Sequence, residues 1–428
     1  MAKLHVEAEP AKVGLDAGRL ERIRSHFHPY VEDGRLPGWL VVVARRGQVA
    51  YVATDGRRDE QGAAVEVDTI WRIYSMTKPV TSVAAMCCYE DGAFDLRDPV
   101  EAYLPGFAGG RVLDGNGPAT RPCGEPVRIW HLLTHTAGMS SELGDDPVAD
   151  AYRRSTAGAA AARADGRPLD LAERVECWAR QPLLFEPGTR WRYSNATDVL
   201  GRLVEVVSGT TLDRFFSERI LEPLGMDDTS FAVPAAEAGR LAELYVPASA
   251  TRRAVPAAIG GDDAPYRRAG RPFGEPFEFL SGSAGLYGTA ADYHRFCQML
   301  LGGGAHDGVR VLGPRTLRLM AMNHLPGGRD LEEVGAGGPS ETSRDGIGFG
   351  LGFSVVLDPV RTRGLASAGT LAWGGAASTE FWVDPAEDLS VLFFTQLLPS
   401  TTWALRSRLR QLVYQAIVDP GPAAGAWS

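Results

Sequence analysis

The chain has 428 residues, of which 44% are hydrophobic and 23% are charged, with 44 lysines and arginines against 53 aspartates and glutamates. This composition is that of a globular protein with a large core, and the length favours two structural lobes. The net charge of −9 argues against nucleic acid or an anionic membrane as the main partner, because both reward basic surfaces.

Neither a leader sequence nor a membrane span is expected. Residues 1–16 contain no apolar run, and no stretch of about 18 apolar residues occurs further along the chain. The five cysteines are scattered, odd in number and without a CxxC pair, which favours free thiols in a reducing compartment. These features together predict a cytoplasmic protein.

The first ninety residues predict two helices with a hairpin between them. Apolar residues at helical spacing, then two β-rich runs around Arg46-Gly47, then a second helical stretch that stops at Asp91-Gly92 carry this prediction. The predicted elements are a helix over 15–31, strands over 39–45 and 49–54, and a helix from about Ser75 to Glu90.

The middle of the chain is predicted to be helical, and the end returns to strands. Two segments, 233–277 and 326–346, lack periodicity and are interpreted as irregular loops that shape a substrate site. The remaining predicted elements are helices over 151–163, 171–180, 199–208 and 212–221, strands over 350–357, 378–383 and 389–395, and a closing helix over 402–418.

The order of these elements predicts an α+β fold. Antiparallel strands at both ends of the chain most simply form one sheet, flanked by the terminal helices. The helical middle would then be a second lobe inserted into the first. We therefore expect an α/β sandwich lobe from residues 1–100 and 280–428, and a mainly helical lobe with irregular loops from residues 101–279.

Ser75-Met-Thr-Lys78 stands at the predicted start of the second helix. Residues three apart on a helix share a face, so Ser75 and Lys78 would be neighbours. A serine hydroxyl group is a poor nucleophile until a base removes its proton, and a lysine kept neutral by burial can be that base. Pro79 follows, which supports a helix start because proline is tolerated in a first turn.

The use of lysine in this chain makes Lys78 conspicuous. Only Lys3, Lys12 and Lys78 are lysines, and the other 41 basic residues are arginines. Arginine cannot be deprotonated in a protein, whereas a desolvated lysine can. The single lysine in the body of the chain therefore indicates a task that arginine cannot perform.

Two further motifs carry groups of the kind that such a serine needs. Tyr193 in Tyr193-Ser-Asn195 could share a proton with Lys78 and act as general base and then acid, while Asn195 could bind a substrate carbonyl or hold the lysine. Trp373-Gly-Gly375-Ala376 precedes the strand predicted from Ser378. There Gly374 and Gly375 would let substrate approach the backbone, and the N–H of Ala376 could complete an oxyanion hole with that of Ser75.

These three motifs, in this order, resemble the active-site boxes of the β-lactamase/penicillin-binding-protein superfamily, and most of all its class-C-like esterase branch, the family VIII carboxylesterases. The resemblance covers about residues 15–418. Three more stretches strengthen it: 132–139 (LLTHTAGM), 185–188 (FEPG) and 281–289 (SGSAGLYGT).

The resemblance implies an α/β lobe with an inserted helical lobe and an active site between them. It also implies Ser75 as the nucleophile, Lys78 and Tyr193 as the pair of bases, and a covalent acyl-enzyme. No metal or cofactor is implied. The expected partner is a small-molecule ester, and a homodimer is the default assembly because symmetric dimers are the commonest oligomers.

The third box departs from that of the β-lactamases. Those enzymes carry Lys-Thr-Gly, whose cation meets the carboxylate of the antibiotic, whereas Trp373 stands in that place here. The indole favours substrates that are apolar and uncharged. We therefore expect a serine carboxylesterase of the EC 3.1.1 type that cleaves esters of small, apolar acyl groups, with a weak β-lactamase activity left open because an arginine could supply the charge.

Other interpretations stay open or are disfavoured. An acyltransferase, a D-amino-acid peptidase or amidase, and a homologue that only binds are the alternatives within the same fold. An α/β-hydrolase would need Gly-x-Ser-x-Gly, and Ser281-Gly-Ser-Ala-Gly285 lacks its first glycine. The four-residue spacing of His131 and His135 could bind zinc on a helix, but Gly138 follows closely and no HExxH motif exists, so a role in a loop is expected.

Overall fold

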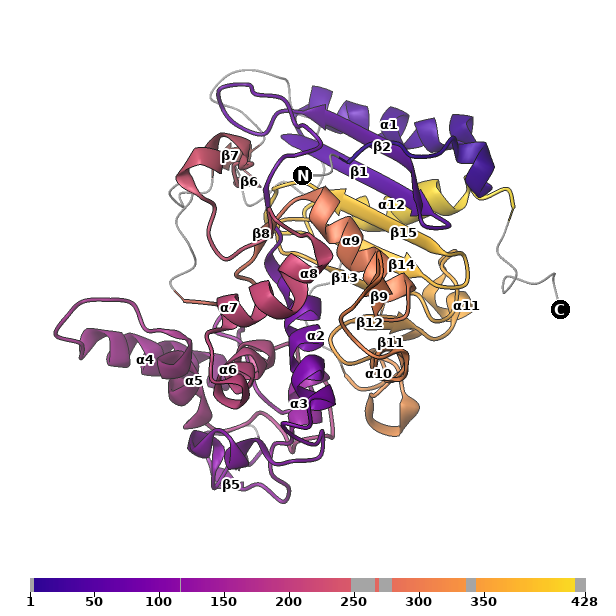
Figure 1. Ribbon diagram of the computed structural model, residues 1–428. Coiled ribbons are helices and arrows are strands. Elements are labelled where there is room, and N and C mark those ends of the chain that lie inside the picture. The colour runs from indigo at the N-terminus through magenta and orange to yellow at the C-terminus, as the bar shows by residue number, and fades with distance from the viewer. Residues whose placement is uncertain (1–3, 116, 248–265, 269–278, 336–343, 420–428) are drawn as a thin grey trace.

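An antiparallel sheet forms the centre of the computed structural model, which describes residues 4–115, 117–247, 266–268, 279–335 and 344–419. Seven described strands follow the order β11-β12-β13-β14-β15-β1-β2 (Figure 1). The two ends of the chain meet where β1 pairs with β15, with Leu40 opposite Phe394. The strands are β1 (Gly38–Arg45), β2 (Gln48–Gly56), β11 (Ile347–Phe349), β12 (Ser354–Val356), β13 (Leu371–Gly374), β14 (Glu380–Asp384) and β15 (Leu389–Phe394).

Helices cover both faces of this sheet. Alternate residues of a strand point to opposite faces: along β1, Trp39 and Val41 join the apolar cluster of α1 (Ala17–Glu32) and α12 (Leu405–Tyr414). Leu40 and Val42 join the cluster of α2 (Thr77–Glu90) and α9 (Ala290–Leu301) on the opposite face. The terminal helices therefore share one face, and the helix that follows Ser75 belongs to the other.

The remaining helices and short strands surround this core. Figure 1 shows α4, α5 and α6 beyond α2, away from the sheet. The helices are α3 (Ile129–Leu133), α4 (Pro147–Ala161), α5 (Leu171–Ala179), α6 (Ala196–Ser208), α7 (Leu212–Phe216), α8 (Glu222–Leu224), α10 (Pro314–Met320) and α11 (Pro359–Thr362). The short strand pairs are β3 (Trp71–Arg72) with β8 (Tyr287–Gly288), β4 (Arg111–Leu113) with β5 (Thr120–Pro122), β6 (Tyr245–Pro247) with β7 (Tyr266–Arg268), and β9 (Ala305–His306) with β10 (Val309–Arg310).

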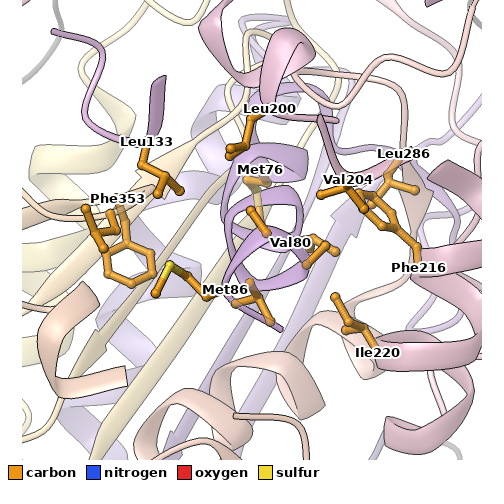
Figure 2. Packing of buried hydrophobic residues seen from close by; sticks show 14 of the residues in the cluster. Met76, Val80, Met86, Leu133, Leu200, Val204, Phe216, Ile220, Leu286 and Phe353 are labelled. Carbon is orange, nitrogen blue, oxygen red and sulfur yellow. The ribbon is translucent and has the colours of Figure 1, made fainter. Parts of the chain in front are cut away.

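Helix α2 is the central element of the larger core. Twelve of its fourteen residues are buried, which is the pattern of a helix packed on all sides rather than on one stripe. Figure 2 shows Met76, Val80 and Met86 enclosed by side chains from several other elements, among them Leu200 of α6 and Phe353. The first turn of α2, which carries Lys78, is therefore held firmly from every side.

The structure confirms the predicted α+β class and most predicted elements, with boundaries shifted by a few residues. The predicted strand over 350–357 is wrong: β11 and β12 form a hairpin there, and the chain turns at Gly350–Phe353. Gly352 has φ +109°, and a Cβ atom on it would lie 2.2 Å from Ser82 Oγ. The chain turns where only glycine permits this close approach to α2. Strand β13 was not predicted from the sequence.

The two irregular segments are described only in part. Residues 248–265 and 269–278 of the first, and 336–343 of the second, lie outside the described residues. The described part of the first contains a 3-10 helix over Ala235–Arg240 and the strands β6 and β7. Within the described part of the chain, no helix combines the length and the apolar character needed to cross a bilayer.

Candidate active site

Ser75 lies in a short turn between a strand and the buried helix. Strand β3 pairs with β8, and a single 3-10 turn over Tyr74–Met76 then leads directly into α2. Tyr74 adopts φ +45°, a left-handed conformation that is uncommon for a residue with a side chain and often marks functional sites. Ser75 is half-buried in this turn. The sequence predicted that the helix begins near Ser75, whereas α2 begins two residues later, at Thr77.

Lys78 lies next to Ser75, as the spacing predicted. Its Nζ atom is 3.4 Å from Ser75 Oγ and donates a hydrogen bond of 3.0 Å to the carbonyl oxygen of Ser283. The lysine is only 4% exposed. A buried amine beside a serine hydroxyl group is the arrangement in which lysine can exchange a proton with it.

Tyr193 completes the group from the segment just before α6. Its hydroxyl group donates a hydrogen bond of 2.7 Å to Ser75 Oγ, and Lys78 Nζ lies 4.5 Å from the centre of its ring. Both groups that could accept the proton of Ser75 therefore surround the same oxygen atom. The structure thus brings together the three residues that the sequence proposed as catalytic.

A buried carboxylate behind Lys78 was missed by the sequence analysis. Asp198 Oδ1 accepts hydrogen bonds from Ser281 Oγ at 2.7 Å and from Ser283 N at 3.0 Å, so Asp198 fixes the residue whose carbonyl holds Lys78. Burial raises the pKa of Asp198, and the charge of Lys78 lowers it. The available signal was an acidic residue on the buried side of α6, next to Val199 and Leu200.

The Trp373-Gly-Gly segment reaches the same region from the sheet. Trp373 and Gly374 end β13, and a turn leads from Gly375 to β14. A Cβ atom on Gly375 would lie 2.5 Å from the carbonyl oxygen of Ile73, so only glycine permits this approach to the chain just before Ser75. Ala376 is exposed in the turn that follows.

Aromatic side chains gather beside Tyr193. The ring of Trp373 lies 5.6 Å from that of Tyr193 and 5.3 Å from that of Phe349, and Trp191 lies 6.2 Å from Tyr193. This aromatic cluster also contacts Leu325, Leu331 and Val334, which flank or belong to the second irregular segment. One side of the site is therefore an apolar surface.

Asn195 stands at the N-terminal cap of α6, half-buried, and its backbone N–H donates to Ser140 O at 3.0 Å. Its side chain does not cap the helix. Asn195 is two positions after Tyr193 in the chain, and its role in binding substrate stays a prediction.

The two histidines that suggested a metal are buried. Burial, and secondarily the charge of Lys78, hold the pKa of His135 well below its usual value, so the imidazole is neutral at pH 7. His131 Nδ1 accepts the backbone N–H of Arg128 at the start of α3. Within the described ranges, no group of three or more His, Cys, Asp or Glu side chains is placed to hold a metal ion.

The comparison with known proteins agrees with the resemblance seen in the motifs. A family model described as Beta-lactamase matches residues 23–415, and the chain belongs to that family.

Protein Rv1367c of Mycobacterium tuberculosis is 37% identical over 382 residues, which cover 86% of this chain and 88% of that protein. Esterase EstB of Burkholderia gladioli is 35% identical over 417 residues, or 95% of this chain and 98% of EstB. A solved structure titled EstCE1, a hydrolase with promiscuous acyltransferase activity, has a TM-score of 0.74 at 28% identity and covers 93% of this chain and 99% of its own.

Proposed function

We propose that this protein is a serine carboxylesterase in which Ser75 is the nucleophile and Lys78 and Tyr193 are the bases. The observation that carries the proposal is the position of Ser75 Oγ, 2.7 Å from the Tyr193 hydroxyl group and 3.4 Å from Lys78 Nζ. The similarity to EstB, named an esterase, supports the same reaction class.

The reaction has two steps. Ser75 Oγ attacks the ester carbonyl carbon while its proton passes to the Tyr193–Lys78 pair, and the tetrahedral intermediate collapses with loss of the alcohol, which takes that proton. Water then attacks the carbonyl carbon of the acyl-enzyme and gives a proton to the Tyr193–Lys78 pair. The bond between this carbon and Ser75 Oγ breaks, the carboxylic acid leaves, and the pair returns the proton to Ser75 Oγ. The N–H groups of Ser75 and Ala376 bind the oxyanion in both steps.

The aromatic cluster supports substrates with small, apolar acyl groups. Trp373 provides an indole beside Tyr193 at the position where β-lactamases carry a lysine, so this position offers no cation to a substrate carboxylate. Asn195, Gly374 and Gly375 are proposed to line the path by which the ester carbonyl reaches Ser75.

An acyltransferase is the second candidate. It would use the same acyl-enzyme and pass the acyl group to an alcohol or amine instead of water. The hydrolase EstCE1 is described as having promiscuous acyltransferase activity, which favours this alternative over the peptidase and β-lactamase readings.

Parallel assays test the proposal. Turnover of p-nitrophenyl acetate, butyrate and octanoate and of a chromogenic cephalosporin is measured for the wild type and for Ser75→Ala. The proposal predicts ester cleavage that is fastest for the short chains, lost in the mutant, and far above cephalosporin cleavage. Serine-independent ester cleavage, or cephalosporin cleavage that dominates, would overturn it, and added alcohols that divert the acyl group would favour the transferase.

A further inference from the structure

The turn between β13 and β14 is fastened to the last helix by one side chain. Arg406 of α12 places Nη2 2.8 Å from the carbonyl oxygen of Gly375 and 3.0 Å from that of Thr379. Gly375 N in turn donates to Thr379 O at 2.9 Å. One guanidinium nitrogen therefore holds both ends of the five-residue turn that contains Ala376.

The two glycines of Trp373-Gly-Gly have separate reasons in this arrangement. A Cβ atom on Gly374 would lie 2.7 Å from Arg406 Nη2, and one on Gly375 would lie 2.5 Å from the carbonyl oxygen of Ile73. The first glycine thus makes room for the guanidinium group, and the second makes room for the chain that leads to Ser75. The turn is packed tightly between Arg406 on one side and the nucleophile segment on the other.

The carbonyl that Arg406 binds and the N–H of Ala376 belong to the same peptide unit. In a planar trans peptide these two groups point in opposite directions. Helix α12 packs on the sheet face of Trp39 and Val41, whereas α2 belongs to the opposite face. A carbonyl of Gly375 that points toward α12 therefore directs the N–H of Ala376 toward the face where Ser75 lies.

The charge of Arg406 acts in the same direction as its geometry. A cation at a carbonyl oxygen polarises the peptide unit, which makes the N–H at its other end a stronger hydrogen-bond donor. Donors that are fixed before the reaction stabilise a developing oxyanion without reorganisation, and this is the main advantage of an oxyanion hole.

We propose that Arg406 is a positioning residue of the oxyanion hole, which it builds by holding the Gly375–Ala376 peptide with its N–H directed at the oxyanion on the Ser75 adduct. This inference rests on the proposed function, because it assumes that Ser75 forms the adduct. The proposal assigns Arg406 no contact with substrate or with the reacting atoms.

The experiment compares Arg406→Met with Arg408→Met, a control on the same helix whose exposed side chain bonds only to Gln411 among the described contacts. Three quantities are measured: kcat and KM for p-nitrophenyl butyrate per site labelled by a fluorophosphonate, the inhibition constant of an alkylboronic acid, which forms a tetrahedral anionic adduct on serine, and the thermal midpoint. Arg406→Lys tests rescue, since its ammonium can donate to the same carbonyls.

We expect Arg406→Met to lower both kcat per labelled site and boronate affinity by about tenfold to a hundredfold. This factor does not exceed the effect of removing a whole oxyanion-hole donor, because the N–H group itself remains. KM should change by less than about threefold, because the donor acts on the tetrahedral state and not on bound substrate. Arg406→Lys should recover most of both losses, and Arg408→Met should match the wild type.

Two results would overturn the inference. In the first, Arg406→Met has the same kcat per labelled site and the same boronate affinity as Arg408→Met. In the second, Arg406→Met raises KM by the same factor by which it weakens boronate binding. If Arg406→Met does not fold, Arg406→Gln, which is neutral and shorter, is held to the same expectations. Failure of the proposed function is recognised separately, because the wild type would then lack ester cleavage that depends on Ser75 and boronate binding would persist in Ser75→Ala.

Discussion

The hydroxyl group of Tyr193 donates a 2.7 Å hydrogen bond to Ser75 Oγ, whereas Lys78 Nζ lies 3.4 Å from the same oxygen. The tyrosine oxygen is therefore the nearer neighbour of Ser75 Oγ, and Lys78 Nζ lies beside the tyrosine ring, 4.5 Å from its centre. This order of distances leads to different expectations for changes at the two residues.

Tyr193→Phe should lower kcat for p-nitrophenyl butyrate by about a hundredfold to ten thousandfold, the range of general acid–base catalysis. The ring and its packing remain, so the unfolding midpoint should stay near that of the wild type. Tyr103→Phe is the matched control, since it also loses one hydroxyl hydrogen bond, to Asp98, away from the site. Near-normal turnover by Tyr193→Phe would remove the tyrosine from the mechanism.

Lys78→Arg should be nearly as damaging as Lys78→Ala. Arginine keeps the positive charge but cannot give up its proton, so it cannot act as a base. Lys12→Arg, at an exposed position near the N-terminus, should leave the rate unchanged. Steady-state turnover of the three variants decides the matter, and an arginine variant that keeps most of the wild-type rate would show that only the charge of Lys78 is needed.

Asp198→Asn separates the charge of the buried carboxylate from its geometry. Asp198 Oδ1 accepts both hydrogen bonds, and the amide oxygen of asparagine can accept the same two. Removal of the charge should lower turnover by about tenfold, the factor that corresponds to loss of one charge-assisted interaction.

The stability of Asp198→Asn should be equal to or higher than that of the wild type. Burial raises the pKa of Asp198 above its unfolded value, so the folded state loses stability as pH rises through that raised pKa and the carboxylate ionises. The ionised form of the buried carboxylate therefore lowers the stability of the fold, and asparagine, which cannot ionise, removes this cost. A lower unfolding midpoint with unchanged turnover per active site would mean that Asp198 only supports the fold.

Acid should destabilise the protein through buried histidines. Burial, with a smaller effect of Arg128, lowers the pKa of His131 to about 4. The unfolded chain gains a proton below about pH 6.5 that the folded state does not accept. Stability is therefore lost as pH falls from about 6.5 to about 4, by up to roughly 3 kcal/mol for this residue.

Urea unfolding at pH 7 and at pH 4.5 measures this loss. His131→Asn should flatten the dependence of unfolding free energy on pH. His28→Asn should steepen it, because the hydrogen bond to Asp55 raises the pKa of the exposed His28 and stabilises the fold in acid. An unchanged pH dependence in His131→Asn would contradict the assignment of a buried, neutral imidazole.

The sequence predicted the residues that short motifs place together. Ser75 and Lys78 are neighbours because they are three positions apart at the entrance to a helix, and the scarcity of lysine singled out Lys78. The helix and strand boundaries of α1, β1 and β2 also followed from local patterns. The packing of Tyr193 against Ser75 needed the resemblance to a family, since the two residues are 118 positions apart in the chain.

The parts that were missed depend on contacts between distant segments. The hairpin of β11 and β12 turns at Gly352 because Ser82 of α2 lies against it, and no local pattern in 350–357 announces that contact. Asp198 accepts from the Ser281 hydroxyl group and the backbone N–H of Ser283, and Arg406 donates to the carbonyl groups of Gly375 and Thr379. Most of these partners are backbone groups, which any residue would supply, so no sequence pattern marks the contacts. The lobe boundaries at residues 101 and 279 and the homodimer stay predictions.

Labelling with a p-nitrophenyl alkylphosphonate decides whether Ser75 is the nucleophile. We expect each folded molecule to release one equivalent of p-nitrophenol, to lose its esterase activity in step, and to carry the phosphonyl group on Ser75 when its peptides are mapped by mass spectrometry. A label on any other residue, or loss of activity in the absence of a label on Ser75, would contradict this role of Ser75.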